Sequence, residues 1–100
     1  MIKGTTPTHY FTLPFDTDIL ANARVTYAQN EIVILTKELN ECKCDKNVIS
    51  CKLSQEETLK FNYPKTVQIQ VSILTKGGDL LKSDILTVSI KQCLDKEVLV

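Results

Sequence analysis

The chain has 100 residues, of which 43% are hydrophobic, and its twelve basic and twelve acidic residues give a formal net charge of zero. This length supports one modest core, so we expect a single domain over residues 1–100. Nucleic acid is an unfavourable partner, because its recognition needs clustered positive charge and Arg24 is the only arginine. The sequence shows neither an apolar run of the roughly 18 residues that a membrane helix needs nor a secretory signal. We therefore expect no membrane contact and synthesis in the cytoplasm.

Strands are favoured over helices along the whole chain. Val, Ile and Thr supply 28 of the 100 residues and Ala only 3, a balance that fits pleated, half-buried surfaces. The first predicted strand begins at Thr8, where His9, Phe11 and Leu13 alternate with other residues. Pro14 cannot donate to a ladder, which places this strand at the edge of a sheet.

The next two strands, over residues 23–28 and 31–38, are predicted to form a hairpin that turns at Gln29-Asn30. That turn gives one apolar, core-facing set of cross-strand pairs: Tyr27 with Ile32, Val25 with Ile34 and Ala23 with Thr36.

The opposite face of the same hairpin is also partly apolar. In this register it carries Val33 and Leu35 beside Thr26 and Arg24. A strand that is apolar on both faces is either covered on both sides or forms half of a protein interface. Both alternatives stay open, and the second makes Arg24, Val33 and Leu35 candidate interface residues.

A change of sheet is predicted in the middle of the chain. Residues 39–47 read as a polar loop, and a strand follows over 48–53. Ser54 to Glu57 is a capping box, in which the serine hydroxyl accepts from the N3 amide and the glutamate reaches back to the serine amide. We expect a single helical turn near residues 55–60 that crosses from one sheet to the other.

The longest hairpin is predicted over Thr66 to Gln92, with Gly77-Gly78 as a two-residue turn. This turn pairs Val67 with Val88 and Ile69 with Leu86 on a core face. The same register would bury Asp84 opposite Val71, so we expect a β-bulge or a strong twist near Ser83-Asp84. The tip would then pair Leu74 with Leu81 and present both to a partner.

Candidate chemistry is sparse. Cys42, Cys44, Cys51 and Cys93 could bind zinc or form a disulfide, but there is only one close pair, and free thiols fit the spacing best. His9 is the only histidine and has no acid or nucleophile nearby in sequence, which favours a structural role. No catalytic or phosphate-binding motif is present, so we expect neither an enzyme nor a cofactor.

Several stretches together suggest a family: IKGTTPTHYFTLPFDTDIL, ARVTYAQNEIVILTKE, LSQEETLKF, VQIQVSILTKGGDLLKSDILTVSI and CLDKEVL. They resemble small immunoglobulin-like β-sandwich proteins encoded among the virion and tail genes of phages and prophages of Firmicutes. The resemblance covers nearly the whole chain. It implies a virion or tail component, or an assembly accessory, and supplies no catalytic residues.

The predicted fold is all-β: an immunoglobulin-like antiparallel β-sandwich of six to seven strands with one short helical crossover near residues 55–60. The leading hypothesis is a non-enzymatic module of a virion, which contacts copies of itself or other virion proteins. Its candidate interface residues are Arg24, Val33, Leu35, Leu74 and Leu81. A glycan-binding module that uses Tyr10 or Tyr63 is the alternative, and a small metalloprotein is the third.

Overall fold

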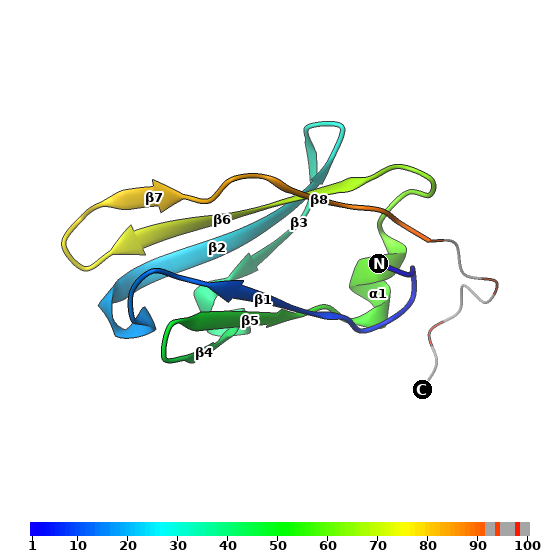
Figure 1. Cartoon of the computed structure of the whole chain (residues 1–100). Helices are drawn as coiled ribbons and strands as arrows, with labels where there is room; N and C mark the ends of the chain where they lie inside the picture. The colour runs from blue at the N-terminus through cyan, green and yellow to red at the C-terminus, as the bar shows by residue number, and fades with distance from the viewer. Residues whose placement is uncertain (92–93, 95–97, 99–100) are drawn as a thin grey trace.

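The computed structural model describes residues 1–91, 94 and 98 and shows an all-β protein with one short α-helix (Figure 1). The strands in these residues are β1 (Thr8–Thr12), β2 (Leu20–Gln29), β3 (Ile32–Glu38), β4 (Lys43–Asp45), β5 (Val48–Lys52), β6 (Val67–Thr75), β7 (Leu80–Lys82) and β8 (Leu86–Val88). The helix α1 spans Gln55–Leu59, and two 3₁₀ turns, η1 (Thr17–Ile19) and η2 (Leu39–Glu41), complete the connections. The predicted all-β class is confirmed.

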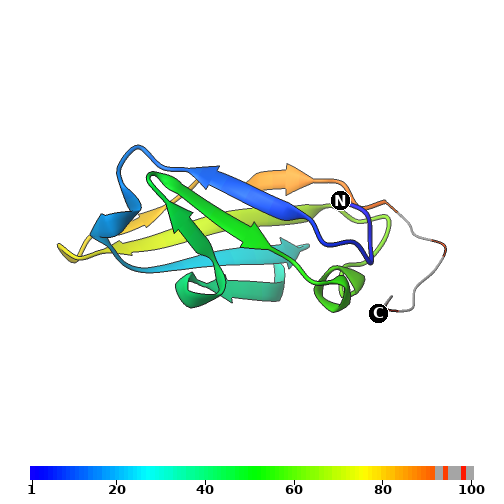
Figure 2. The ribbon, with the colours of Figure 1, turned by 90° about the horizontal axis from the view of Figure 1, so that it is seen from below.

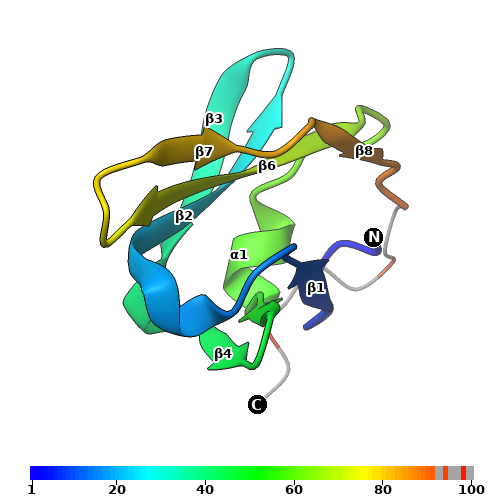
Figure 3. The same cartoon turned by 60° about the vertical axis from the view of Figure 1, so that its left-hand side comes forward.

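The strands form two antiparallel sheets that face each other as two layers (Figures 2 and 3). One sheet has the order β1-β5-β4, and the other has the order β3-β2-β6-β7, with β8 paired to the first part of β6. The helix α1 lies at the end of the sandwich that also holds the N-terminus (Figure 1). No helix within residues 1–91 is long and apolar enough to cross a membrane.

The core lies between the two sheets and is built from odd-numbered strand residues, because side chains alternate between the faces of a strand. Its fully buried members include Val25 and Tyr27 of β2, Ile49 and Cys51 of β5, and Val67 of β6. Phe61, after α1, is also fully buried and closes one end of this core.

The described residues hold eight strands rather than the predicted six to seven. The residues predicted as a polar loop contain β4, which pairs with β5. All three β4 residues are exposed, so the strand has no buried face to produce an alternating pattern. The second arm of the long hairpin is divided into β7 and β8, which adds the other strand.

The register predicted for β2 and β3 is wrong. The turn lies at Asn30-Glu31, which have φ angles of 50° and 65°, as a two-residue hairpin turn requires at both positions. A further irregularity between Tyr27 and Ala28 shifts the pairing again, and Tyr27 lies opposite Leu35. Leu35 consequently packs against the core, whereas the structure places Ile32, expected inside, 66% exposed.

The break predicted in the long hairpin is confirmed, although its turn is not as expected. Val67 pairs with Val88 and Ile69 with Leu86, but nearer the tip the partners are Ile73 with Leu81 and Leu74 with Leu80. The pairing of Leu74 with Leu81 is therefore wrong. The turn has three residues, closed by a hydrogen bond of 2.9 Å from the Thr75 amide to the Asp79 carbonyl, and only Gly78 of the two glycines has a positive φ.

Ser83 forms the bulge that reconciles the two registers. Its amide donates to the Val71 carbonyl and its hydroxyl accepts from the Val71 amide, both at 2.9 Å. This one residue satisfies both backbone groups of Val71 at the point where the bulge interrupts the ladder. Asp84 is exposed, which removes the burial conflict that predicted the break.

The predicted capping box at the start of α1 is present. The Ser54 hydroxyl accepts from the Glu57 amide at 3.1 Å, and the Glu57 carboxylate accepts from the Ser54 amide at 2.8 Å. Thr58 is fully buried, and its hydroxyl lies 2.8 Å from the Thr5 carbonyl. The helix lies in the crossover from β5 to β6, as the sequence predicted, and Thr58 also ties it to the N-terminal segment.

Gln29, at the end of β2, fixes the loop that follows α1. The structure leaves its side chain 3% exposed, with the amide group donating to the Asn62 carbonyl at 2.9 Å and accepting from the Asn62 amide at 2.8 Å. We expect Gln29→Leu to lower the free energy of unfolding by about 2 kcal/mol, because both part-buried hydrogen bonds to the Asn62 backbone are lost. Urea denaturation measures this loss.

The control for this prediction is Asn62→Ala. It removes an exposed side chain but keeps the backbone groups that Gln29 binds, so we expect a change below about 0.5 kcal/mol. Equal effects of the two variants would show that the amide contact does not stabilise the loop.

Candidate functional site

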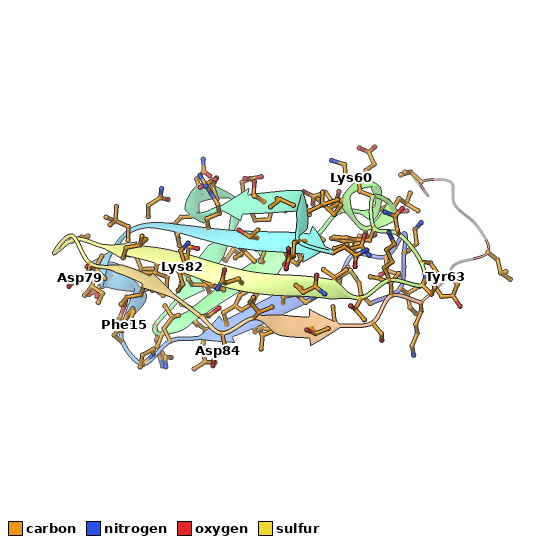
Figure 4. The ribbon with its side chains drawn as sticks, turned by 90° about the horizontal axis from the view of Figure 1, so that it is seen from above. Phe15, Lys60, Tyr63, Asp79, Lys82 and Asp84 are labelled. Carbon is orange, nitrogen blue, oxygen red and sulfur yellow. The ribbon has the colours of Figure 1, made fainter. Side chains whose placement is uncertain are left out.

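An apolar groove lies between two sheet edges, and we call it the edge groove. One wall comes from β1 and the residues that follow it, and the other comes from β6, β7 and β8. The groove has a volume of about 400 Å³. Its lining residues include Tyr10, Phe11, Leu13, Phe15, Val71, Ile73, Leu81 and Leu86. Phe15, Lys82 and Asp84, which also line it, lie along this side of the molecule (Figure 4).

The groove has a buried floor and an exposed rim. Val71 and Ile73 of β6 form the floor and are 3% and 6% exposed, whereas Leu86 at the rim is 52% exposed. Tyr10 of β1 is 70% exposed. The sandwich is therefore open along this side, and apolar side chains from both sheets contact the opening.

Among the residues that the structure describes, β1 is a free edge along the groove. Within residues 1–91 its only strand partner is β5. The backbone hydrogen bonds at the two ends of β1 show which of its residues face β5. The Leu13 amide donates to the Asn47 carbonyl, and the Pro7 carbonyl accepts from the Leu53 amide, so the odd-numbered residues of this segment bond toward β5. Because hydrogen-bonded positions alternate in an antiparallel ladder, the backbone groups of Tyr10 point away from β5. They are available to an added strand.

The structure does not gather the five predicted interface residues into one surface. Arg24 and Leu74 line a shared shallow hollow on the outer face of the larger sheet, where Arg24 also forms an ion pair of 2.7 Å with Glu38. Leu81 lines the edge groove instead, and Leu35 packs against the core. Val33 is 56% exposed and lies opposite Ala28.

Sequence reasoning missed the groove because its walls come from segments far apart in the chain. Leu81 is the only groove residue among the candidate contacts, and the sequence places it at a projecting hairpin tip. The exposed, uncharged alternation of β1 is the one local signal that could have found the groove, since edge strands usually carry a protecting charge.

A row of hydrogen-bonded polar side chains, which we call the polar chain, crosses the core beneath β1. His9 Nδ1 lies 2.9 Å from the Tyr27 hydroxyl, which lies 3.6 Å from Cys51 Sγ. Cys51 is in turn a neighbour of Cys42, whose pKa it raises. His9 thus has the satisfied, partly buried setting of a structural histidine.

The pKa shifts of His9, Tyr27 and Cys42 each favour the neutral form of the group. Burial lowers the pKa of His9, with a smaller contribution from the positive N-terminus, and burial raises the pKa of Tyr27. Burial and the neighbouring Cys51 raise the pKa of Cys42 to about 12. A catalytic cysteine nucleophile needs the opposite shift, so these contacts disfavour catalysis by Cys42 at neutral pH and make its thiol slow to react there.

The structure shows three of the cysteines, Cys42, Cys44 and Cys51, as free thiols. Cys93 lies outside the described residues, so the four-thiolate arrangement considered from the sequence is not described. Among residues 1–91, 94 and 98, no group of three or more side chains is arranged to hold a metal ion.

An ion pair links the larger sheet to α1. Lys37 of β3 is 9% exposed, and its ammonium lies 2.7 Å from the Glu57 carboxylate. Burial opposes the charge on both groups, but their mutual hydrogen bond outweighs it: the pKa of Lys37 is raised and that of Glu57 is lowered. This buried pair holds the crossover helix against the sheet and is a structural contact.

The two tyrosines considered for glycan binding occupy different elements. Tyr10 lines the edge groove, and Tyr63, which is 50% exposed, lies in the loop after α1 (Figure 4). No ring contact joins them among the described residues. A shared stacking platform is therefore not formed.

These features were compared with known proteins. Comparison with models of protein families, with curated proteins and with solved structures found no match to this chain. The features of this chain that bear on function are the edge groove and the β1 edge beside it.

Proposed function

We propose that this chain is a non-enzymatic interaction module that self-associates through the free edge of β1, as a component of a phage- or prophage-derived virion or tail. The observation that carries the proposal is the uncharged free edge beside the apolar edge groove. Strand addition to such an edge is a common mode of protein recognition, in which backbone hydrogen bonds supply affinity and neighbouring apolar surface adds to it.

The strand order supports an immunoglobulin-like arrangement. The order β1-β5-β4 over β3-β2-β6-β7 corresponds to B-E-D over C′-C-F-G of that fold. In the immunoglobulin fold, strand A lies beside strand B, at the edge that is free in β1. The position beside β1 is thus one that a further strand occupies in related architectures.

The β1 edge is better suited to pairing than the edge across the groove. No Lys, Arg, Asp or Glu occurs in Thr8–Thr12, and burial lowers the pKa of His9, so β1 is uncharged at neutral pH. The β7 to β8 edge carries Lys82, Asp84 and the Ser83 bulge, which are the features that protect edges from pairing.

A second copy of this chain fits the β1 edge. Antiparallel pairing of two β1 strands about Tyr10 places no like charges opposite each other, and Tyr10 presents its outward backbone groups to its counterpart. The net charge of zero leaves little long-range repulsion between the copies. The result is a two-fold dimer with one continuous sheet across both molecules.

The test is the oligomeric state of Tyr10→Pro, measured by light scattering over a concentration series. Proline removes the outward amide while keeping the β1 to β5 hydrogen bonds, which involve the odd-numbered positions. Loss of two hydrogen bonds across the two-fold axis should weaken the dimer by about 10- to 100-fold.

Two controls accompany this test. Tyr10→Thr keeps the amide and a strand-forming side chain, and should remain dimeric. Val33→Lys changes an exposed residue on the outer face of the other sheet and should also remain dimeric. A monomeric wild-type protein, or a Tyr10→Pro dimer of unchanged affinity, would refute the edge-pairing mechanism.

The virion assignment is tested separately by gene neighbourhood. Flanking genes for tail or capsid proteins would support it. A neighbourhood of unrelated metabolic genes would count against it and leave the edge-pairing test unaffected.

A further inference from the structure

Two cysteines face each other across the β4–β5 hairpin. The Cα partners in this hairpin are Asp45 with Val48, Cys44 with Ile49 and Lys43 with Ser50. One further step in the same antiparallel register places Cys42 opposite Cys51. The backbone of Cys42 is extended, with φ −111° and ψ 164°, so the strand geometry continues to this residue.

The backbone hydrogen bonding makes this a close pair. The Leu53 amide donates to the Pro7 carbonyl, and Cys51, two residues earlier in the same ladder, pairs with His9. The backbone groups of Cys51 therefore point toward β1 and away from β4. In an antiparallel ladder such a non-hydrogen-bonded pair has Cα atoms about 4.5 Å apart, which lies inside the range of about 4.4–6.8 Å that disulfides span.

Both side chains also point the same way. Cys51 is fully buried in the core, and Cys42 is partly buried and packs against that core. Cys51 also raises the pKa of Cys42, as a neighbouring thiol does. Both side chains therefore lie on the core side of the β4–β5 hairpin, as a cross-strand disulfide requires.

We infer that Cys42 and Cys51 form a redox-active pair, which low-molecular-weight disulfides convert to a cross-strand disulfide bond. The bond would close a loop from residue 42 to residue 51 and fasten β4 to β5 directly after η2, where the chain passes from one sheet to the other.

The reaction with glutathione disulfide is a two-step exchange. Because burial raises the pKa of Cys42 to about 12, little thiolate is present at neutral pH, so the exchange is slow there and is run at alkaline pH. The Cys42 thiolate attacks one glutathione sulfur, forms a mixed disulfide and releases one glutathione. The Cys51 thiolate then attacks the Cys42 sulfur, and the second glutathione leaves. The protein loses two electrons and two thiol protons, and the glutathione disulfide gains both to become two thiols.

The partial exposure of Cys42 makes it the first attacking group, because Cys51 is fully buried. Tyr27 does not obstruct the product. Its hydroxyl lies 3.6 Å from Cys51 Sγ and can donate to that sulfur in the thiol or in the disulfide. Cys44 is exposed and lies opposite Ile49, so it is the natural control.

The experiment equilibrates the full chain with glutathione disulfide, blocks the remaining thiols and maps the disulfides by mass spectrometry after trypsin digestion without reduction. Lys37, Lys43, Lys46 and Lys52 separate the three cysteines into different peptides, over residues 38–43, 44–46 and 47–52. The expected product joins peptide 38–43 to peptide 47–52. Cys44→Ser and Cys93→Ser should both retain this link, and Cys42→Ser should lose it.

Thermal unfolding supplies a second measurement on the same samples. Closing this loop should raise Tm by roughly 10 °C in the oxidised wild type relative to the reduced protein, and the shift should be absent in Cys42→Ser. A link through Cys44 or Cys93, a product that stops at a glutathione adduct, or no reaction would each overturn the inference. This experiment is independent of the proposed self-association, which β1 mediates.

Discussion

Replacing Glu57 with glutamine is expected to lower the free energy of unfolding by about 3 kcal/mol at pH 7. The change removes the negative partner of Lys37, whose side chain is 11% exposed and 2.7 Å from the Glu57 carboxylate. Removing one member of a buried pair leaves the other charge uncompensated, which typically costs about 3–5 kcal/mol. The lower end applies here because Glu41 remains 4.0 Å from the Lys37 ammonium.

Glutamine keeps an oxygen that can accept from the Ser54 amide, so the capping box survives the substitution. Urea denaturation of wild type and Glu57→Gln therefore isolates the ion pair. Glu56→Gln is the matched control, because Glu56 is an exposed glutamate in the same first helical turn. We expect that control to change stability by less than about 0.5 kcal/mol. Similar losses in the two variants would indicate a general helix effect instead.

The pH dependence of this difference follows from the two pKa shifts. The Lys37 hydrogen bond holds the pKa of Glu57 below its ordinary 4.5 despite burial, so its contribution is complete above pH 4.5 and is lost as pH falls through the lowered value. Glu57 holds the pKa of Lys37 above its ordinary 10.5, so that contribution is lost only as pH rises through the raised value. The advantage of wild type over Glu57→Gln should be constant between these limits and should shrink in acid.

The sequence predicted correctly those features that depend on residues close together in the chain. The capping box at Ser54 and the bulge near Ser83 are both present, since one depends on adjacent residues and the other on a charge that could not stay buried. Neither feature required knowledge of the partner sheet.

The predicted register of the β2–β3 hairpin was wrong because its turn uses residues that rarely adopt the required positive φ angles. Glu31 has a φ of 65°, which non-glycine residues seldom adopt outside turns. The observed turn lies one residue later than predicted, and a bulge shifts the pairing again, so β3 presents its other face to the core. Lys37 is therefore buried and Ile32 is exposed. Because β3 has apolar residues on both faces, its sequence pattern favours neither register, and the register is set by contacts with the rest of the fold.

The candidate sites are formed by residues that lie far apart in the sequence, so their contacts could not be predicted from local patterns. Lys37 meets Glu57 from another element, and the edge groove joins β1 to β7 and β8. The Cys42 and Cys51 pair was accessible in principle, because a turn at Lys46-Asn47 places the two residues opposite each other. Their spacing gave no signal without β4, whose exposed residues lack alternation.

Tyr27 is expected to contribute to stability mainly by filling the core, and only secondarily through its hydroxyl. It is fully buried, with its ring centroid 5.6 Å from that of His9 and 6.0 Å from that of Phe61. Tyr27→Ala removes the whole ring and should lower the free energy of unfolding by about 4 kcal/mol, the usual cost of an aromatic cavity.

Tyr27→Phe keeps the ring and removes only the hydroxyl that lies between His9 Nδ1 and Cys51 Sγ. The expected loss is about 1–2 kcal/mol, because the His9 nitrogen loses a partner while packing is retained. Urea denaturation of both variants at pH 7, with circular dichroism as the probe, separates the two contributions. If Tyr27→Phe were as unstable as Tyr27→Ala, the hydroxyl would stabilise the fold more than the ring does, and the polar chain would be what holds the two sheets together at this point.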